Sequence, residues 1–152
     1  MLQARRFGGM DRLYGVAGAA NIANAHVLIV GIGGVGSWVA ESLARSGVGE
    51  ITLVDMDHVA ESNINRQIHA LESTLGMAKV TAMKERIAQI NPQCLVHTVD
   101  DFVTPENWIA LIQDLQASPT TRSPLSAVID ACDQVKSKAV SYTHLTLPTN
   151  RE

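Results

Sequence analysis

The sequence has few of the features that mark disulfide-bonded, membrane-spanning or nucleic-acid-coating proteins. It holds two cysteines, Cys94 and Cys132, which we expect to be reduced rather than paired. No apolar run approaches the ~18 residues of a membrane-spanning helix, and the N-terminus lacks the pattern of a signal peptide. A net charge of −3 predicts no general nucleic-acid surface, although a local basic patch stays possible. We therefore expect a soluble, cytoplasmic protein with no membrane segment.

Aromatic residues are also scarce, at 4% of the 152 residues, whereas 46% of the chain is hydrophobic. A core built from this composition must rest on Ala, Val, Ile and Leu, as in many α/β folds. The length fits one domain, or the first part of a longer one.

Glycine, in contrast, is concentrated just after residue 30. A short aliphatic run at 27–30 stops at Gly31, Gly33, Gly34 and Gly36, and a helix-compatible segment follows. Strand, glycine-rich turn and helix follow one another in this order in nucleotide-binding βαβ units. Gly31 would allow the tight turn, Gly33 a close approach to a phosphate, and Gly36 close packing of helix on strand. The motif alone is weak, and a turn that needs glycine only for its geometry is the alternative.

Alternation of strands and helices predicts a Rossmann-like, doubly wound, mainly parallel α/β sheet with helices on both faces. We expect a flexible basic start at 1–9 and one or two short helices within 10–24. The predicted strands are 27–30, 50–54, 95–99 and 127–130. The predicted helices are 35–46, 76–90, a helix with Thr104 as cap and Pro105 at its first position, and a helical start at 136–140.

Acidic residues follow two strands at the edge where such a sheet binds its ligand. Asp55 follows the second strand, near the ~20-residue offset at which a carboxylate meets a ribose. Asp130 and Asp133 follow the fourth strand, where a carboxylate could hold Mg²⁺. The alternative is that these aspartates only cap strand or helix ends. Cys132 lies between them, and we expect a buried small residue rather than a nucleophile.

Two cations favour a triphosphate over a dinucleotide. Arg66 follows Asn63 and Asn65, and polar residues are uncommon at this density unless a loop lines a site. Lys79 lies in the first turn of a predicted helix, where the dipole disfavours a cation unless an anion is near. Each could instead be a solvated surface charge. The histidines show no ligand spacing, so we expect no zinc site.

Six segments in this order resemble the ubiquitin-activating-enzyme superfamily, whose members adenylate carboxylates. These segments are 31–36, 55–57, 62–67, 76–79, 90–92 and 130–133. More narrowly, residues 6–15, 65–71 and 99–105 resemble the tRNA threonylcarbamoyladenosine dehydratases. The resemblance covers about residues 5–139, and the ordered set is far more specific than the glycine motif alone.

The resemblance implies ATP and Mg²⁺ as cofactors and adenylation of a carboxylate as the chemistry. Arg66 and Lys79 would hold the phosphates, and Asp133 would help to hold the metal. In the dehydratases, the activated group is the threonylcarbamoyl side chain of a tRNA adenosine, which then cyclises. By motif, the nucleotide contacts would come from Gly31, Gly33, Gly34, Gly36, Asp55 (on the ribose), Asp57, Asn63, Arg66 and Lys79.

The chain departs from the superfamily pattern in two places. Activators of carrier proteins use an arginine that reaches the ATP of the partner subunit; its place here is Gly9, and Arg12 could replace it, or it could be lost. The family is dimeric, so we expect a homodimer. We divide the chain into an N-terminal helical segment (1–25), the first part of an ATP-binding adenylation domain (26–139) and a tail foreign to the family (140–152). We expect this chain by itself to be inactive; the alternative for the tail is a genuine disordered end.

Three other functions stay open. An activator of a ubiquitin-like sulfur-carrier protein would use the same nucleotide step and would have a carrier or sulfur-transfer protein as partner. A dinucleotide-binding oxidoreductase is disfavoured by Arg66 and Lys79. A non-catalytic interaction module is the last alternative.

Overall fold

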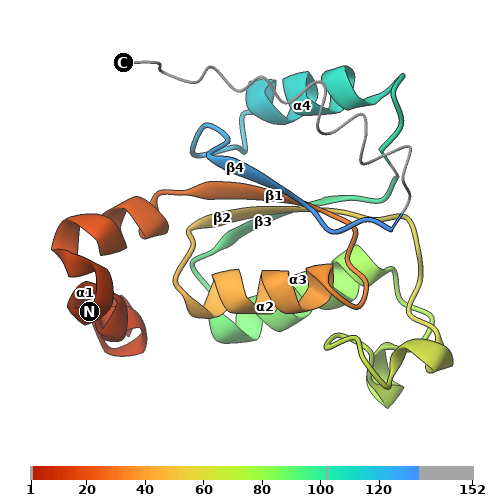
Figure 1. Ribbon diagram of the computed structural model, residues 1–152, viewed down its shortest axis with the longest axis horizontal. Coiled ribbons are helices and arrows are strands. Elements are labelled where there is room, and N and C mark those ends of the chain that lie inside the picture. The colour runs from red at the N-terminus through yellow and green to blue at the C-terminus, as the bar shows by residue number, and fades with distance from the viewer. Residues whose placement is uncertain (1, 102, 134–152) are drawn as a thin grey trace.

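The computed structural model describes residues 2–101 and 103–133, with a four-stranded parallel sheet at its centre (Figure 1). All neighbouring strands are parallel, so their carboxyl ends lie at one edge of the sheet. The predicted Rossmann-like sheet is thereby confirmed. In spatial order, the strands are β3 (Leu95–Val99), β2 (Glu50–Val54), β1 (His26–Val30) and β4 (Ala127–Asp130).

The central strands β1 and β2 are buried along their whole length, which explains their nearly unbroken aliphatic sequence. Their register pairs His26 with Glu50 and Val30 with Val54, so both strands end at the same level. The turn after β1 and the turn after β2 therefore start side by side.

Helices cover both faces of the sheet, as predicted (Figure 1). Helices α2 (Gly36–Arg45) and α3 (Lys79–Ile90) lie on one face and form the larger core with β1 and β2. Helix α4 (Trp108–Ala117) lies on the other face, where Trp108 and Leu28 belong to one buried cluster. Two short 3₁₀ turns, η1 (Glu61–Asn63) and η2 (Glu72–Thr74), connect β2 to α3. Within residues 2–101 and 103–133, no helix is long and apolar enough to cross a membrane.

The N-terminal segment differs from the prediction at its start. A flexible start is predicted at 1–9, but α1 (Leu2–Ala23) is helical from Leu2 onward. The helix is interrupted at Gly15, which has φ 73° and ψ 166°, so the alternative of two helices in one segment is confirmed. Figure 1 shows α1 beyond the amino-terminal ends of the strands.

Helix α4 also begins later than predicted, at Trp108 rather than just after Thr104. The Thr104 N–H donates to Asn107 Oδ1 at 2.8 Å, and the Asn107 N–H donates to Thr104 Oγ1 at 3.2 Å. These reciprocal bonds close a turn before the helix starts. Helix α3 likewise starts at Lys79 rather than at residue 76. The predicted helical start at 136–140 and the tail at 140–152 lie outside the described residues.

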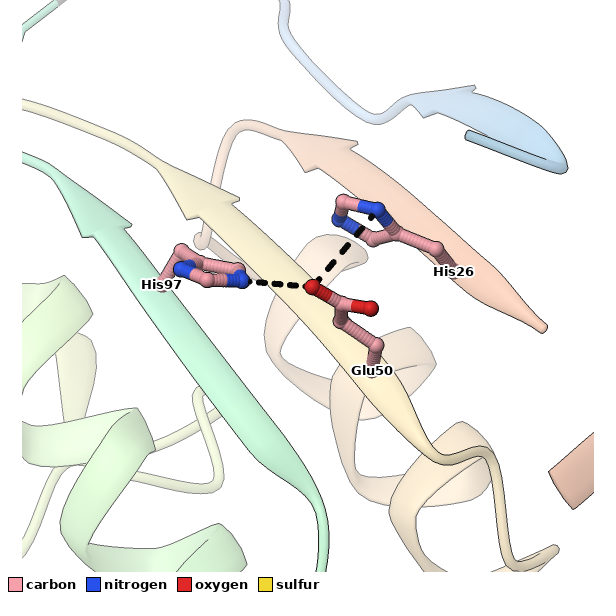
Figure 2. A group of neighbouring side chains, drawn as sticks. All are labelled: His26, Glu50 and His97. Atoms are coloured by element: carbon pink, nitrogen blue, oxygen red, sulfur yellow. Dashed lines mark hydrogen bonds and ion pairs between the residues drawn. The ribbon is translucent and has the colours of Figure 1, made fainter. Parts of the chain in front are cut away.

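A polar cluster joins three strands at the amino-terminal end of the sheet (Figure 2). His97 Nε2 lies 2.7 Å from Glu50 Oε1, and His26 Nδ1 lies 3.9 Å from the same oxygen. Glu50 also accepts the N–H groups of Arg122 and Ser123, at 3.0 and 2.8 Å. The cluster therefore ties the loop before β4 to the sheet.

The three side chains of this cluster place ligand atoms within 4.8 Å of one another, although their sequence spacing predicts no metal site. Each already has a hydrogen-bond partner: His26 Nδ1 faces Ser123 O at 3.1 Å, and His26 Nε2 faces Thr52 Oγ1 at 2.8 Å. Burial raises the pKa of Glu50, but its hydrogen bonds from His97 and the backbone outweigh this and lower the pKa overall. We therefore interpret the cluster as a hydrogen-bonded brace, since its charge is satisfied without an ion.

Candidate nucleotide-binding site

A cavity of about 490 Å³ opens at the carboxyl edge of the sheet. Its walls are the glycine turn after β1, the connection from β2 to α3, Asp101 and Val103 after β3, and the turn after β4. The structure thus brings together the predicted site residues Gly31, Gly33, Gly34, Asp55, Asp57, Asn63, Arg66, Lys79 and Asp133.

The glycine turn is shaped by two close backbone approaches. Gly31 has φ 86°, and a Cβ there would lie 3.0 Å from the backbone of Ala131 and Cys132. A Cβ on Gly36 would lie 1.7 Å from the Gly31 carbonyl oxygen, which is far inside van der Waals contact. Gly36 is therefore needed where α2 packs on the strand end, and it lies outside the lining of the cavity. Its direct contact with a nucleotide stays a prediction.

Asp55 fixes this turn from the end of β2. Its Oδ2 accepts the Ile32 N–H at 2.7 Å, and its Oδ1 accepts the Asp57 N–H at 2.8 Å. Each carboxylate oxygen can accept more than one hydrogen bond. The side chain can therefore hold the turn and still accept hydroxyl groups of a ribose.

Lys79 brings a buried positive charge to the cavity. Lys79 is 7% exposed and occupies the first position of α3, where the helix dipole disfavours a cation. Its Nζ lies 3.8 Å from Asp57 Oδ2, and the Asp57 side chain is 69% exposed. A long contact to an exposed carboxylate balances a buried charge only in part. An anion in the cavity would complete the balance.

Arg66 lies beside the glycine turn. Its Nη1 donates to Ser62 O at 2.9 Å and to Asn65 Oδ1 at 3.0 Å. Its side-chain carbons lie 3.7 Å from the place where Gly34 would carry a Cβ. The Trp38 indole donates to Arg66 O at 2.8 Å and attaches this segment to α2. The guanidinium is thus held next to the backbone that would receive phosphates.

The remaining predicted residues complete two walls. Asn63 is 9% exposed, and its Oδ1 accepts the Ala60 N–H at 2.9 Å, which stabilises the turn before Arg66. Asp133 is exposed on the wall after β4. Asp130 stands behind that wall, where its Oδ1 accepts the Cys132 N–H at 3.0 Å.

Both cysteines are free thiols, as expected. Burial raises the pKa of Cys94 to about 12, so this thiol stays protonated and is no nucleophile.

Two polar residues of the cavity are not predicted as site residues by the sequence. Gln67 is 5% exposed, and its Oε1 has no hydrogen-bond partner within the described part of the chain. Its position directly after Arg66 is the available signal. Asp101 also lines the cavity. It lies within the matched segment 99–105 and just beyond the correctly predicted end of β3, which are the available signals.

His69 supports the site from behind. Its Nε2 donates to Ile32 O at 2.7 Å. Burial, and then the nearby Lys79 charge, lower the pKa of His69, and the bond to Ile32 O only partly opposes this. The ring is therefore neutral at physiological pH. Ile32 is held on both sides, by His69 at its carbonyl and by Asp55 at its N–H.

Arg12 is not brought to this cavity. It is exposed on α1, at the opposite end of the sheet from the glycine turn (Figure 1). Any contact of Arg12 with a nucleotide would have to be in another chain, and that role stays a prediction.

Comparison with known proteins places this architecture. A model described as the ThiF family matches residues 9–142. The chain belongs to the ThiF family. This ThiF-family chain is 54% identical over 135 residues to the tRNA threonylcarbamoyladenosine dehydratase of Escherichia coli (strain K12), with 89% of this chain and 47% of the relative covered. It is 49% identical over 135 residues to the dehydratase of Haemophilus influenzae, with 89% of this chain and 48% of the relative covered. The ThiF-family chain spans about half the length of these curated relatives.

Solved structures agree. The ThiF-family chain matches a structure named TcdA (CsdL) with a TM-score of 0.83 and 52% identity, over 91% of this chain and 53% of that one. It matches the structure of the E. coli dehydratase TcdA in complex with ATP with a TM-score of 0.81 and 52% identity, over 91% of this chain and 54% of that one. The predicted resemblance is thus confirmed. A further relative, adenylyltransferase and sulfurtransferase MOCS3 of Drosophila yakuba, is 34% identical over 140 residues, with 88% of this chain and 30% of the relative covered.

Proposed function

We propose that this chain is the nucleotide-binding part of an ATP-dependent tRNA threonylcarbamoyladenosine dehydratase. The observation that carries the proposal is the convergence of Arg66, buried Lys79 and the glycine turn on one cavity. Two cations that line the same cavity as the glycine turn before α2 suit a triphosphate. The identity to two dehydratases, and the ATP complex of one of them, support the same ligand.

In this proposal, the cavity stabilises charge on the transferred phosphorus. A carboxylate oxygen of the threonylcarbamoyl group attacks the α-phosphate, a new P–O bond forms, and pyrophosphate leaves with the electrons of the broken bond. The amide-type nitrogen of the same group then attacks the activated carbonyl and AMP leaves, which closes the ring. Arg66 and Lys79 would act electrostatically, since both line the cavity that we propose to hold the phosphates.

Mg²⁺ fits the donor set of the wall after β4. Asp133 offers an exposed carboxylate there, and one or two carboxylates with phosphate and water oxygens are the ligands Mg²⁺ prefers. When bound, the ion would neutralise phosphate charge. We assign Asp133 to this role.

We also propose a cytoplasmic homodimer in which Arg12 reaches the partner's nucleotide. In support, Arg12 is exposed and lies beside Leu13, Tyr14 and Val16, which are 56% to 77% exposed. An exposed apolar segment next to a cation is a candidate contact for a second copy. Sedimentation of wild type and Leu13→Asp would test this assembly; two monomeric species would contradict it.

Calorimetry with ATP·Mg²⁺ and with NAD⁺ tests the nucleotide. We expect binding of ATP and at least tenfold weaker binding of NAD⁺; the reverse preference would exclude the proposal.

Activation of a sulfur-carrier protein is the second candidate, favoured by the similarity to MOCS3. Binding of the ATP-loaded chain to tRNA carrying threonylcarbamoyladenosine, compared with binding to a ubiquitin-like carrier, separates the two.

A further inference from the structure

A second cavity, of about 410 Å³, lies at the opposite end of the molecule from the nucleotide site. It is lined by Arg6, Phe7, Arg45, Arg86, Gln89 and Ile90. These residues come from α1, α2 and α3, at the end of the sheet where the strands begin. Three of the six are arginines, and no carboxylate is among them.

The cavity is held in place by contacts between its elements. The Arg6 guanidinium donates through Nη1 to Ile90 O at 2.7 Å, which attaches α1 to the last residue of α3. The Phe7 ring lies against Gly47, where a Cβ would come within 3.1 Å of the ring. Because Gly47 follows the end of α2, the first turns of α1 are fixed to both helices.

The charges of this cavity do not balance. Glu41 is buried between Arg86, at 2.6 Å, and Arg45, at 2.9 Å. Burial raises the pKa of Glu41, but the hydrogen bonds of the two arginines outweigh this and keep it ionised. Within the described residues, Glu41 is the one carboxylate that forms an ion pair with any of the three guanidinium groups of the cavity. The Arg45 side chain is 60% exposed, and these bonds use only part of the five N–H donors of each guanidinium.

We propose that this arginine cavity binds the phosphodiester backbone of the tRNA substrate. Guanidinium groups match phosphate oxygens in geometry as well as in charge. Because the cavity lies at the far end of the sheet, RNA bound there leaves the ATP site of the same chain open. A five-residue strand and its flanking turns span on the order of 20–30 Å, which one arm of a tRNA covers. The inference rests on the proposed function, because it takes tRNA as the substrate.

The test compares two double variants of the full chain with equal reduction of charge. Arg6→Gln/Arg45→Gln removes two cations from the cavity, whereas Arg5→Gln/Lys84→Gln removes two exposed cations from outside it. Affinity for tRNA is measured at several salt concentrations. We expect the cavity variant to bind at least tenfold more weakly at 0.1 M salt. The slope of log K for tRNA binding against the logarithm of salt concentration should be smaller in magnitude by about 1.4–1.8. Each phosphate that is no longer neutralised lowers this magnitude by roughly 0.7–0.9.

The control variant should bind tRNA within threefold of wild type. ATP binding, measured by calorimetry, should be unchanged in both variants. If the Arg6 change disturbs the docking of α1, the single variant Arg45→Gln keeps the test valid, because that side chain is mostly exposed. Its tRNA affinity should fall at least threefold, and its salt slope should fall by about half as much as in the double variant.

Three outcomes would overturn the inference. Equal tRNA affinities of the cavity and control variants would do so, with the proposed function intact. Loss of inorganic phosphate binding with tRNA affinity retained would assign the cavity to a free anion instead. No tRNA binding by the wild type would remove the proposed substrate and this inference with it, while ATP binding would still stand.

Discussion

Replacing Lys79 by methionine gives the sharpest test of the nucleotide site, because it should weaken ATP binding without weakening the fold. Two unit charges about 4 Å apart interact by about 4 kcal/mol at an effective dielectric constant of ~20. Asp57, at 3.8 Å and 69% exposed, already offsets part of the Lys79 charge. We therefore expect a loss of about 2–3 kcal/mol, which raises the Kd for ATP by roughly 30- to 150-fold.

The free energy of unfolding of the Lys79→Met variant should rise or stay unchanged. Lys79 is 7% exposed, so its charge is costly to bury, while methionine has nearly the same length and no charge. Calorimetry with ATP·Mg²⁺ measures the first effect and thermal unfolding the second. Lys84→Met, on the exposed face of the same helix, is the matched control and should change neither. A folded Lys79→Met protein with ATP affinity within threefold of wild type would refute the assignment.

Two further predictions concern the stability of the fold. Gly36→Ala places a Cβ against the Gly31 carbonyl oxygen, so α2 must shift. We expect the free energy of unfolding in urea to fall by about 1–3 kcal/mol, and a wild-type midpoint would contradict this packing. Burial lowers the pKa values of His26 and His69 below the ordinary 6.5. As the pH falls through 6.5, the unfolded chain therefore binds more protons than the folded chain. Stability should therefore fall as pH drops from 7.5 to 5.5, by up to about 1.4 kcal/mol per pH unit for each histidine. His69→Gln should reduce the slope in urea titrations; an unchanged slope would contradict the assignment.

The sequence predicts the sheet well because its strands are fully determined by local pattern. Aliphatic runs bounded by glycine, aspartate or proline mark β2, β3 and β4 with their observed bounds. Helix starts are less predictable, since they depend on single hydrogen bonds. Thr104 caps a turn with Asn107 instead of the helix itself, and nothing in the local sequence separates these two outcomes.

The candidate site is predictable where its residues belong to motifs. The glycines and Asp55 stand at strand ends, where the order of the strands brings them together. Arg66 and Lys79 reach the same cavity through the connection from β2 to α3. Gln67 and Asp101 are not predicted as site residues although both lie in segments that carry the resemblance, because a matched segment does not tell which of its side chains face the cavity.

The polar brace at the other end of the sheet escapes prediction for a different reason. His26 and Glu50 are partners in the parallel register, and Glu50 and His97 meet across the next pair of strands. Register follows from three-dimensional pairing and leaves no spacing signal in the sequence. The same holds for the arginine cavity, whose members are spread over three helices.

The two hydrogen bonds that hold the backbone of Ile32 affect the energetics of nucleotide binding. Asp55 fixes its N–H and His69 its carbonyl, and His69 follows shortly after Arg66 and Gln67 in the chain. The glycine turn and the arginine segment are thus joined before any ligand arrives. Little conformational entropy is left to lose when a nucleotide binds, so affinity depends on this rigidity as well as on charge.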